Sequence, residues 1–120
     1  MAKNLEISLL LDFYGEMLTE KQRGVVELYY NEDLSLSEIA AHSLITRQGV
    51  RDSIKRAEGI LLDLEERLGL AKRFRRIQDG LDRITVDARE ISSFNSRHGA
   101  FSEIGKMAAE IAAIASTINE

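Results

Sequence analysis

Apolar residues recur three and four positions apart along almost the whole chain, and no segment sustains the apolar and polar alternation of a strand. The sequence also contains no proline, the residue that most strongly interrupts a helix. These features predict an all-α protein. The predicted helices cover residues 4–18, 20–31, 36–42, about 46–68 and about 71–91, and a last helix begins near residue 102.

The predicted helix starts carry side chains that accept hydrogen bonds from unpaired backbone amides. Residues 19–22 and 35–38 both fit the capping box, in which Ser or Thr and a Glu or Gln three positions later bond each other's amides. Thr46 is the expected N-cap of the fourth helix, and Ser102 is the expected N-cap of the last. Residues 92–100 hold most of the turn-forming residues of the second half and are predicted to form a loop.

Three apolar rows follow the helix period in the second half of the chain. The first consists of Val50, Ile54, Ala57, Leu61, Leu64 and Leu68. The second lies beyond Gly69, which either ends the fourth helix or lies within it, and consists of Leu70, Phe74, Ile77, Leu81, Ile84, Ala88 and Ile91. The third consists of Phe101, Ile104, Ala108, Ile111, Ala115 and Ile118. The second row alternates spacings of four and three, as in a coiled-coil stripe.

These rows divide the chain into a predicted helix-turn-helix domain at residues 1–68 and a helical extension at residues 69–120. Amphipathic helices that extend past a complete trihelical unit must bury their apolar rows. Homodimers are the commonest soluble oligomers, so we expect the extension to dimerise. An intramolecular pair of helices would satisfy the same pattern and stays open as the alternative.

Residues 36–56 have the pattern of a helix-turn-helix, namely a short helix, a three-residue turn and a capped longer helix. The expected fold is a trihelical core of the winged-helix-like or sigma region-four-like kind, followed by long C-terminal helices. Ala40 is small where two helices must cross closely. The positions expected to face the core are apolar, and they are Ile39, Ile45, Val50 and Ile54.

The longer helix of this motif carries basic residues on its other face. Arg47, Arg51 and Lys55 are four positions apart and therefore lie on one side of a helix. In a DNA major groove Arg pairs with guanine and Gln with adenine, while a serine hydroxyl can meet a phosphate. The candidate nucleic-acid-binding residues are Ser37, Thr46, Arg47, Gln48, Arg51, Lys55 and Arg56. The alternative interpretation is a solvated basic face on a plain scaffold, and Asp52 would repel phosphate.

A second basic cluster surrounds one aromatic residue, Phe74. It consists of Lys72, Arg73, Arg75 and Arg76. One interpretation is that these cations hold an RNA or DNA backbone. The other, which we favour, is that Phe74 is buried in the second apolar row and is flanked by solvated cations.

Composition narrows the function classes. The 120 residues include no Cys, so disulfides, thiolate metal sites and Cys nucleophiles are excluded. The net charge is −4, yet residues 35–77 hold nine basic and six acidic groups, so only the centre is basic. No glycine-rich phosphate loop or Ser-His-Asp spacing is present, and we expect neither an enzyme, a metal, a cofactor nor a small-molecule ligand. Without a signal peptide or membrane span, the expected location is the cytoplasm.

Four segments carry a resemblance to a known family. They are Leu-Leu-Leu-Asp-Phe-Tyr-Gly at 9–15, Leu-Thr-Glu-Lys-Gln-Arg at 18–23, Leu-Tyr-Tyr-Asn-Glu-Asp-Leu-Ser-Leu-Ser-Glu-Ile-Ala at 28–40 and Ile-Lys-Arg-Ala-Glu at 54–58. Across residues 4–77 the chain resembles YlxM, a bacterial helix-turn-helix family whose genes lie beside those of the signal recognition particle protein and its receptor. The helix-turn-helix part alone also resembles region four of sigma factors.

The resemblance implies a regulatory or accessory role in the signal recognition particle pathway, but no particular biochemical activity. Two positions depart from the family pattern. The family's Ser-Arg-Gln-Ala-Val-Tyr is here Thr-Arg-Gln-Gly-Val-Arg at residues 46–51, so Arg51 replaces an aromatic residue. Leu44 occupies the turn position where Gly is common.

Three function classes follow from these observations. The first is a dimeric DNA-binding regulator that contacts duplex DNA through the fourth helix. The second is an RNA- or protein-binding accessory of the signal recognition particle that uses the same basic centre together with residues 72–76. The third is a helical interaction module whose C-terminal rows only assemble subunits.

Overall fold

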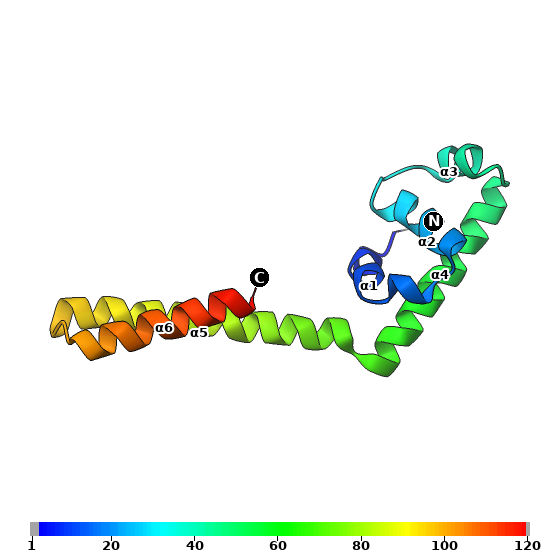
Figure 1. The fold of residues 1–120 in the computed structure, drawn as a ribbon. Coiled ribbons are helices and arrows are strands. Elements are labelled where there is room, and N and C mark those ends of the chain that lie inside the picture. The colour runs from blue at the N-terminus through cyan, green and yellow to red at the C-terminus, as the bar shows by residue number, and fades with distance from the viewer. Residues whose placement is uncertain (1–2, 120) are drawn as a thin grey trace. The chain divides into compact units, whose positions relative to one another are not determined.

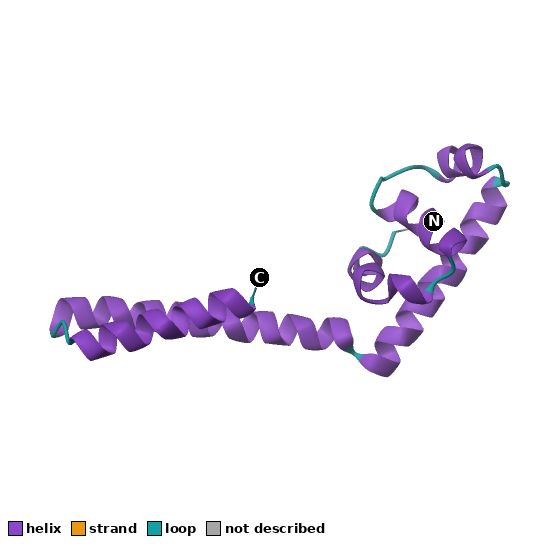
Figure 2. Ribbon diagram, viewed as in Figure 1, coloured by secondary structure: helices purple, strands orange, loops and turns teal. Residues whose placement is uncertain are grey.

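The structure, a computed structural model, describes residues 3–119, and the regular elements within this range are all helical (Figure 2). The all-α class is therefore confirmed. In chain order the elements are α1 (Glu6–Tyr14), a 3-10 turn η1 (Gly15–Met17), α2 (Glu20–Tyr30), α3 (Leu36–Ser43), α4 (Arg47–Leu68), α5 (Leu70–His98) and α6 (Ser102–Ile118) (Figure 1). The chain forms two compact units, of which the first ends at Lys72 and the second begins at Arg73.

The predicted caps of α2, α3 and α4 are confirmed. The Thr19 hydroxyl accepts a hydrogen bond from the Gln22 amide, and the Gln22 side chain accepts one from the Thr19 amide, both at 3.1 Å. The same reciprocal pair joins Ser35 and Glu38. These bonds satisfy amides that have no partner inside the helix, which fixes where each helix begins.

The first helix is shorter than predicted. It ends at Tyr14 rather than at residue 18, because residues 15–17 tighten into the 3-10 turn. The Leu18 amide donates to the Gly15 carbonyl at 3.1 Å, and Leu18 itself is extended. The chain is thereby turned into the capping box that starts α2.

The predicted loop at 92–100 is wrong, because α5 continues to His98. The turn is instead held by Asn95, whose side-chain oxygen accepts from the Phe101 amide at 2.9 Å and whose amide group donates to the Phe101 carbonyl at 2.8 Å. Ser102 is not the N-cap of α6 either; that position is Phe101, which has no side-chain capping bond. A side chain from the preceding helix therefore orders this turn in place of a local cap.

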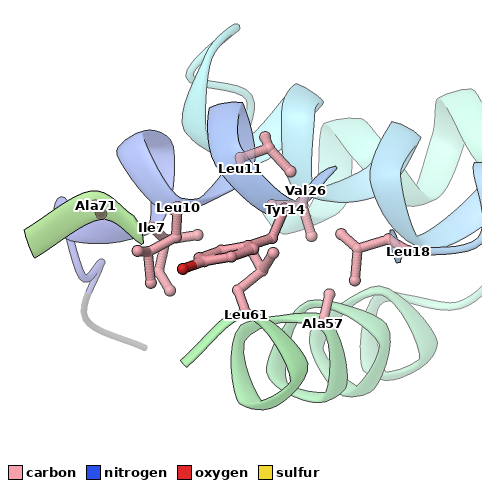
Figure 3. Packing of buried hydrophobic residues seen from close by; sticks show 9 residues of the cluster. All are labelled: Ile7, Leu10, Leu11, Tyr14, Leu18, Val26, Ala57, Leu61 and Ala71. Carbon is pink, nitrogen blue, oxygen red and sulfur yellow. The ribbon is translucent and has the colours of Figure 1, made fainter. Parts of the chain in front are cut away.

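One apolar cluster lies where α1, α2, α4 and the start of α5 meet (Figure 3). The ring of Tyr14 lies among side chains from α1 and α4, and Leu61 points toward it (Figure 3). The buried members are Ile7, Leu10, Leu11, Tyr14, Leu18, Val26, Ala57, Leu61 and Ala71. Large apolar side chains thus fill the interior of the first unit.

A second cluster in the same unit holds the helix-turn-helix together. Its buried members are Val25, Tyr29, Ile39, Val50 and Ile54. Ile45, also expected to face this core, packs against it but is only half-buried. The first half of α4 belongs to this cluster and the second half to the other, so α4 supports both.

A hydrogen-bonded network joins α4 to the start of α5. Gly69 ends α4 in the left-handed conformation (φ 63°), which settles the alternative left open by the sequence. The carboxylate of Glu65 accepts bonds from the Ala71 and Lys72 amides, both at 3.0 Å, and so caps α5. The Tyr14 hydroxyl donates to Glu65 at 2.7 Å and accepts from the Leu70 amide at 3.0 Å. Burial, reinforced by the bond to Glu65, raises the pKa of Tyr14.

The second unit is an antiparallel hairpin of α5 and α6 (Figure 1). Asn95 contacts the start of α6, and at the other end the side-chain amide of Asn119 donates to the Asp82 carboxylate at 2.8 Å. The residues buried along the contact are small or polar, and they are Ala88, Asn95, Ala108 and Ala115. The predicted row from Leu70 to Ile91 does not form this contact, apart from Ala88 and the half-buried Leu81. Phe74, which we expected to be buried, is exposed in the single chain.

Candidate nucleic-acid interface

The turn between α3 and α4 is closed by backbone hydrogen bonds. The Leu44 amide ends α3 by donating to the Ala40 carbonyl, and the Ile45 amide donates to the same carbonyl at 3.3 Å. Leu44 adopts the left-handed conformation with φ 58°, which favours Gly, and its side chain is 91% exposed. The tight turn forms with Leu at this position, although the backbone conformation is strained for a residue with a Cβ.

The start of α4 is fixed by a local cap. The Thr46 hydroxyl accepts from the Gly49 amide at 2.9 Å. A Cβ at position 49 would lie 3.1 Å from that hydroxyl oxygen, so Gly leaves room for the cap. The Thr46 hydroxyl therefore positions α4 as an acceptor, and its O–H group can still donate to a phosphate.

The first half of α4 has a buried face and a basic face. Val50 and Ile54 are fully buried, whereas Arg47, Arg51 and Lys55 are all exposed. Within residues 3–119 no salt bridge engages Arg47 or Arg51. The core thus holds one side of the helix and leaves the guanidinium groups of the other side available.

Arg47 and Arg51 line one small hollow. Its volume is about 180 Å³, and it is bordered by the first residue of α3 and the first two turns of α4: Leu36, Arg47, Gln48 and Arg51. Guanidinium groups form paired hydrogen bonds with phosphate or with the guanine edge. The hollow therefore has the charge and the donors to receive a nucleic-acid group.

The remaining candidate binding residues either bond to a neighbouring side chain or lie outside this hollow. The Gln48 side chain donates to the Asp52 carboxylate at 2.9 Å, which engages one of its two amide N–H groups. Ser37, Lys55 and Arg56 are exposed but do not line the hollow. Gln48 and Asp52 are four residues apart, the spacing at which side chains on one helix meet, so this bond could have been predicted from the sequence.

Comparison with known proteins places this arrangement in a family. Residues 1–98 match the model of the UPF0122 family, described as "Putative helix-turn-helix protein, YlxM / p13 like". The chain belongs to the UPF0122 family. The resemblance to YlxM found in the sequence is thereby confirmed, and α6 lies outside the matched range.

Curated members of the UPF0122 family are about half identical to this chain. A UPF0122 protein of Clostridium kluyveri is 49% identical over 79 residues, which cover 66% of this chain and 71% of the relative. One of Desulforamulus reducens is 55% identical over 69 residues, covering 58% and 59% of the two chains. One of a Thermoanaerobacter species is 52% identical over 80 residues, covering 67% and 68%.

The second basic cluster of this UPF0122 chain lies around the boundary between the two units. Lys72 ends the first unit, and its amide is held by Glu65, while Arg73, Arg75 and Arg76 begin the second. All four side chains are exposed. The cluster is thus a basic surface of α5, with no hollow like the one beside Arg47 among the described cavities.

Two further observations concern other kinds of site. Among residues 3–119, no group of three or more His, Cys, Asp and Glu side chains is placed to hold a metal ion. No helix in the described part of the chain is long and apolar enough to cross a membrane. A larger hollow lies at the tip of the α5–α6 hairpin, and the sequence did not predict it because the composition of residues 92–100 favours a loop.

Proposed function

We propose that this protein is a nucleic-acid-binding regulatory protein of the cytoplasm, not an enzyme, and that it binds duplex DNA through the start of α4. One observation carries the proposal. Arg47 and Arg51 line a common hollow on the exposed face of a helix that Val50 and Ile54 fix to the core. A helix held in this way presents its N-terminal residues rigidly, which is how helix-turn-helix proteins contact base edges.

The candidate residues divide between the phosphate backbone and the bases. Arg47 and Ser37 lie at helix starts, where unpaired amides and the helix dipole favour phosphate. Arg51 and Lys55 lie one and two turns further along α4, where a recognition helix faces base edges. Arg56, the Thr46 hydroxyl and the Gln48 amide supply further donors, and one of the two Gln48 amide N–H groups is bonded to Asp52.

We also propose that the protein acts as a homodimer. Two copies would present two α4 helices, as helix-turn-helix dimers do at two-fold operators. The domain division into residues 1–68 and a dimerising extension at 69–120 remains part of this proposal. Support comes from the large apolar side chains that the hairpin leaves exposed.

A salt titration of binding tests the DNA proposal. Fluorescence anisotropy would follow a labelled duplex from upstream of the protein's own gene with the wild type and with Arg47→Glu/Arg51→Glu. We expect the double variant to bind on the order of 100-fold more weakly, since each paired Arg interaction contributes about 1–3 kcal/mol. The slope of log K against log salt should also become shallower by about 0.9 for each phosphate that the variant no longer neutralises.

The matched control is Lys21→Glu/Arg67→Glu, which makes the same change in net charge at exposed positions outside the candidate site. This control should bind nearly as the wild type does. Equal weakening by both variants would mean that binding depends only on net charge. Circular dichroism of each variant would show that the helices are retained.

The second candidate function is binding to signal recognition particle RNA as an accessory of that particle. Exposed Lys72, Arg73, Arg75 and Arg76 favour it, because clustered cations beside an exposed aromatic ring suit single-stranded RNA. Unlabelled particle RNA as competitor separates the candidates. Displacement of the duplex by RNA, together with loss of RNA binding in Arg73→Glu/Arg76→Glu, would favour the accessory role over DNA regulation.

A further inference from the structure

The α5–α6 hairpin leaves its largest apolar side chains outside. Its helices touch through alanines and polar side chains, so the isoleucines and phenylalanines have no part in that contact. These side chains are between 41% and 63% exposed, and they are Ile77, Ile84, Ile91, Phe94, Phe101, Ile104, Ile111 and Ile118. We call this set the apolar face of the hairpin.

The isoleucines on the apolar face follow a strict heptad. Ile77, Ile84 and Ile91 are seven residues apart on α5, and Ile104, Ile111 and Ile118 are seven apart on α6. A repeat of seven keeps an apolar row in register with another helix over several turns, as in coiled coils and four-helix bundles. The spacing therefore suits packing against further helices better than it suits exposure to water.

Both rows border the same surface at the tip of the hairpin. There a hollow of about 940 Å³ is lined by Ile91 and Phe94 from α5 and by Phe101 and Ile104 from α6. Charged groups of both signs, including Asp87 and Arg97, also line it. Aromatic side chains bordered by charges of both signs are the usual composition of a protein interface and its rim.

The size of the apolar face indicates what covers it. Side chains of this size, about half exposed, together offer roughly 800 Å² of surface. The largest apolar patch on a typical monomer is about 300–600 Å², whereas one side of a standard interface buries about 800 Å². The face is thus too large for an ordinary monomer surface and large enough for one stable interface.

We propose that a second copy of this chain covers the apolar face, so that two α5–α6 hairpins form a four-helix bundle. The face fits its own copy because α5 and α6 each contribute three isoleucines with the same repeat, so a two-fold axis sets isoleucine rows against isoleucine rows. None of the repeating positions is charged. The inference identifies the interface of the homodimer proposed above, and it does not depend on nucleic-acid binding.

Half of this interface comes from α6, which lies outside the range that the family model matches. The bundle therefore depends on residues that the shared helix-turn-helix segment does not contain. Substitutions in α6 alone should weaken the dimer without altering the α3–α4 hollow.

Sedimentation equilibrium of the full chain without nucleic acid, from low to high micromolar concentration, tests the proposal. The wild type should sediment as a dimer of the 13.5 kDa chain, and Ile84→Asp/Ile111→Asp as a monomer. The matched control is Val86→Asp/Ala109→Asp, which places the same two charges on exposed positions outside the isoleucine rows and should stay dimeric. Arg47→Glu/Arg51→Glu should also stay dimeric, whatever its effect on DNA binding.

A second measurement keeps the proposal testable if the aspartate variant fails to fold. Since the chain has no Cys, Ile111→Cys introduces a single thiol. Under mild oxidation it should form a disulfide-linked dimer much faster than Ala109→Cys. A wild type that is monomeric at all concentrations would overturn the proposal. A dimer that survives Ile84→Asp/Ile111→Asp would also overturn it, and so would equal rates of cross-linking for the two thiols. Either of these results would mean that the dimer does not form through the apolar face.

Discussion

The two units of this chain share the same helical period of apolar residues, but those residues are buried in one unit and exposed in the other. In the helix-turn-helix unit the apolar rows point inward, and Ile, Leu, Val and Tyr side chains form two buried clusters. In the hairpin the buried residues are mostly alanines, while the isoleucines and phenylalanines are exposed. An apolar row therefore marks a face suited to packing, but the row alone does not say whether the same chain supplies the packing partner.

The difference follows from the number of helices in each unit. The first unit packs α1, α2, α3 and the long α4 around shared side chains, so several helices enclose each cluster. Two helices alone meet along one line and cannot enclose a core. Small residues such as Ala88 and Ala108 are the ones buried along that line, and the larger side chains remain exposed at its side.

The largest expected effect comes from emptying the core of the first unit. Ile54 is fully buried, and Ile54→Ala should lower the free energy of unfolding by about 2–5 kcal/mol through reduced burial and the cavity left behind. Urea denaturation followed by circular dichroism measures this decrease. The decrease should not depend on protein concentration, because the cluster lies within one chain.

The same truncation in the hairpin, Ile84→Ala, should behave differently. Its cost should appear mainly as weaker dimerisation, so the difference in unfolding midpoint between Ile84→Ala and the wild type should change with protein concentration, whereas the difference for Ile54→Ala should not. Matching concentration dependence in the two variants would contradict the contrast between the units.

A smaller effect is expected from enlarging the contact between α5 and α6. Ala88 is buried between the helices, so Ala88→Leu forces the backbones apart and should cost about 1–3 kcal/mol. The enlargement Ala109→Leu, at an exposed position of α6, should be nearly neutral. Thermal melting of both variants checks the order, and a harmless Ala88→Leu would mean that the small residues are not required for the pairing.

The joint between α4 and α5 should respond to Tyr14→Phe. Removing the hydroxyl takes away the acceptor of the Leu70 amide and one of the bonds that the Glu65 carboxylate accepts. The free energy of unfolding should therefore fall by about 1–2 kcal/mol. The pKa of Tyr14 is raised in the folded protein. The hydroxyl therefore contributes fully to stability below the pKa of an unfolded Tyr, about 10, and this contribution is lost as the pH rises through the pKa of the folded state.

Alkaline titration of the unfolding free energy separates this contribution. The wild type should lose stability above about pH 10, and Tyr14→Phe should lose less over the same range. Part of the loss should remain in both proteins, because burial raises the pKa of Tyr30 to about 12. Identical alkaline profiles would show that the Tyr14 hydroxyl does not stabilise the joint.

The parts of the fold that the sequence predicted well depend on local interactions. The caps at Thr19, Ser35 and Thr46 involve residues three positions apart, and each helix begins where expected. The errors fall at helix ends that no local cap marks in the sequence. Asn95 reaches across a turn to hold Phe101, so α5 runs on through a segment whose composition favours a loop.

The candidate site was predictable to a similar extent. The helical period of α4 alone predicts that Arg47 and Arg51 lie on the face opposite the buried Val50 and Ile54. It does not reveal that α3 contributes Leu36 to a shared hollow, because that depends on how the two helices pack. Nor does the period distinguish rows that stay exposed, such as that of Ile84, from rows that become buried.

The smallest expected effect concerns an isolated apolar side chain of the first unit. Leu44 is exposed and left-handed, so Leu44→Gly removes a backbone strain of about 1–2 kcal/mol but adds chain entropy to the unfolded state. The net result should be a gain in stability below about 1 kcal/mol. Because Leu44 belongs to no continuous apolar row, its removal should leave the sedimentation of the protein unchanged. A variant that instead became monomeric would show that exposed apolar residues of both units serve self-association, and the contrast between the units would fail.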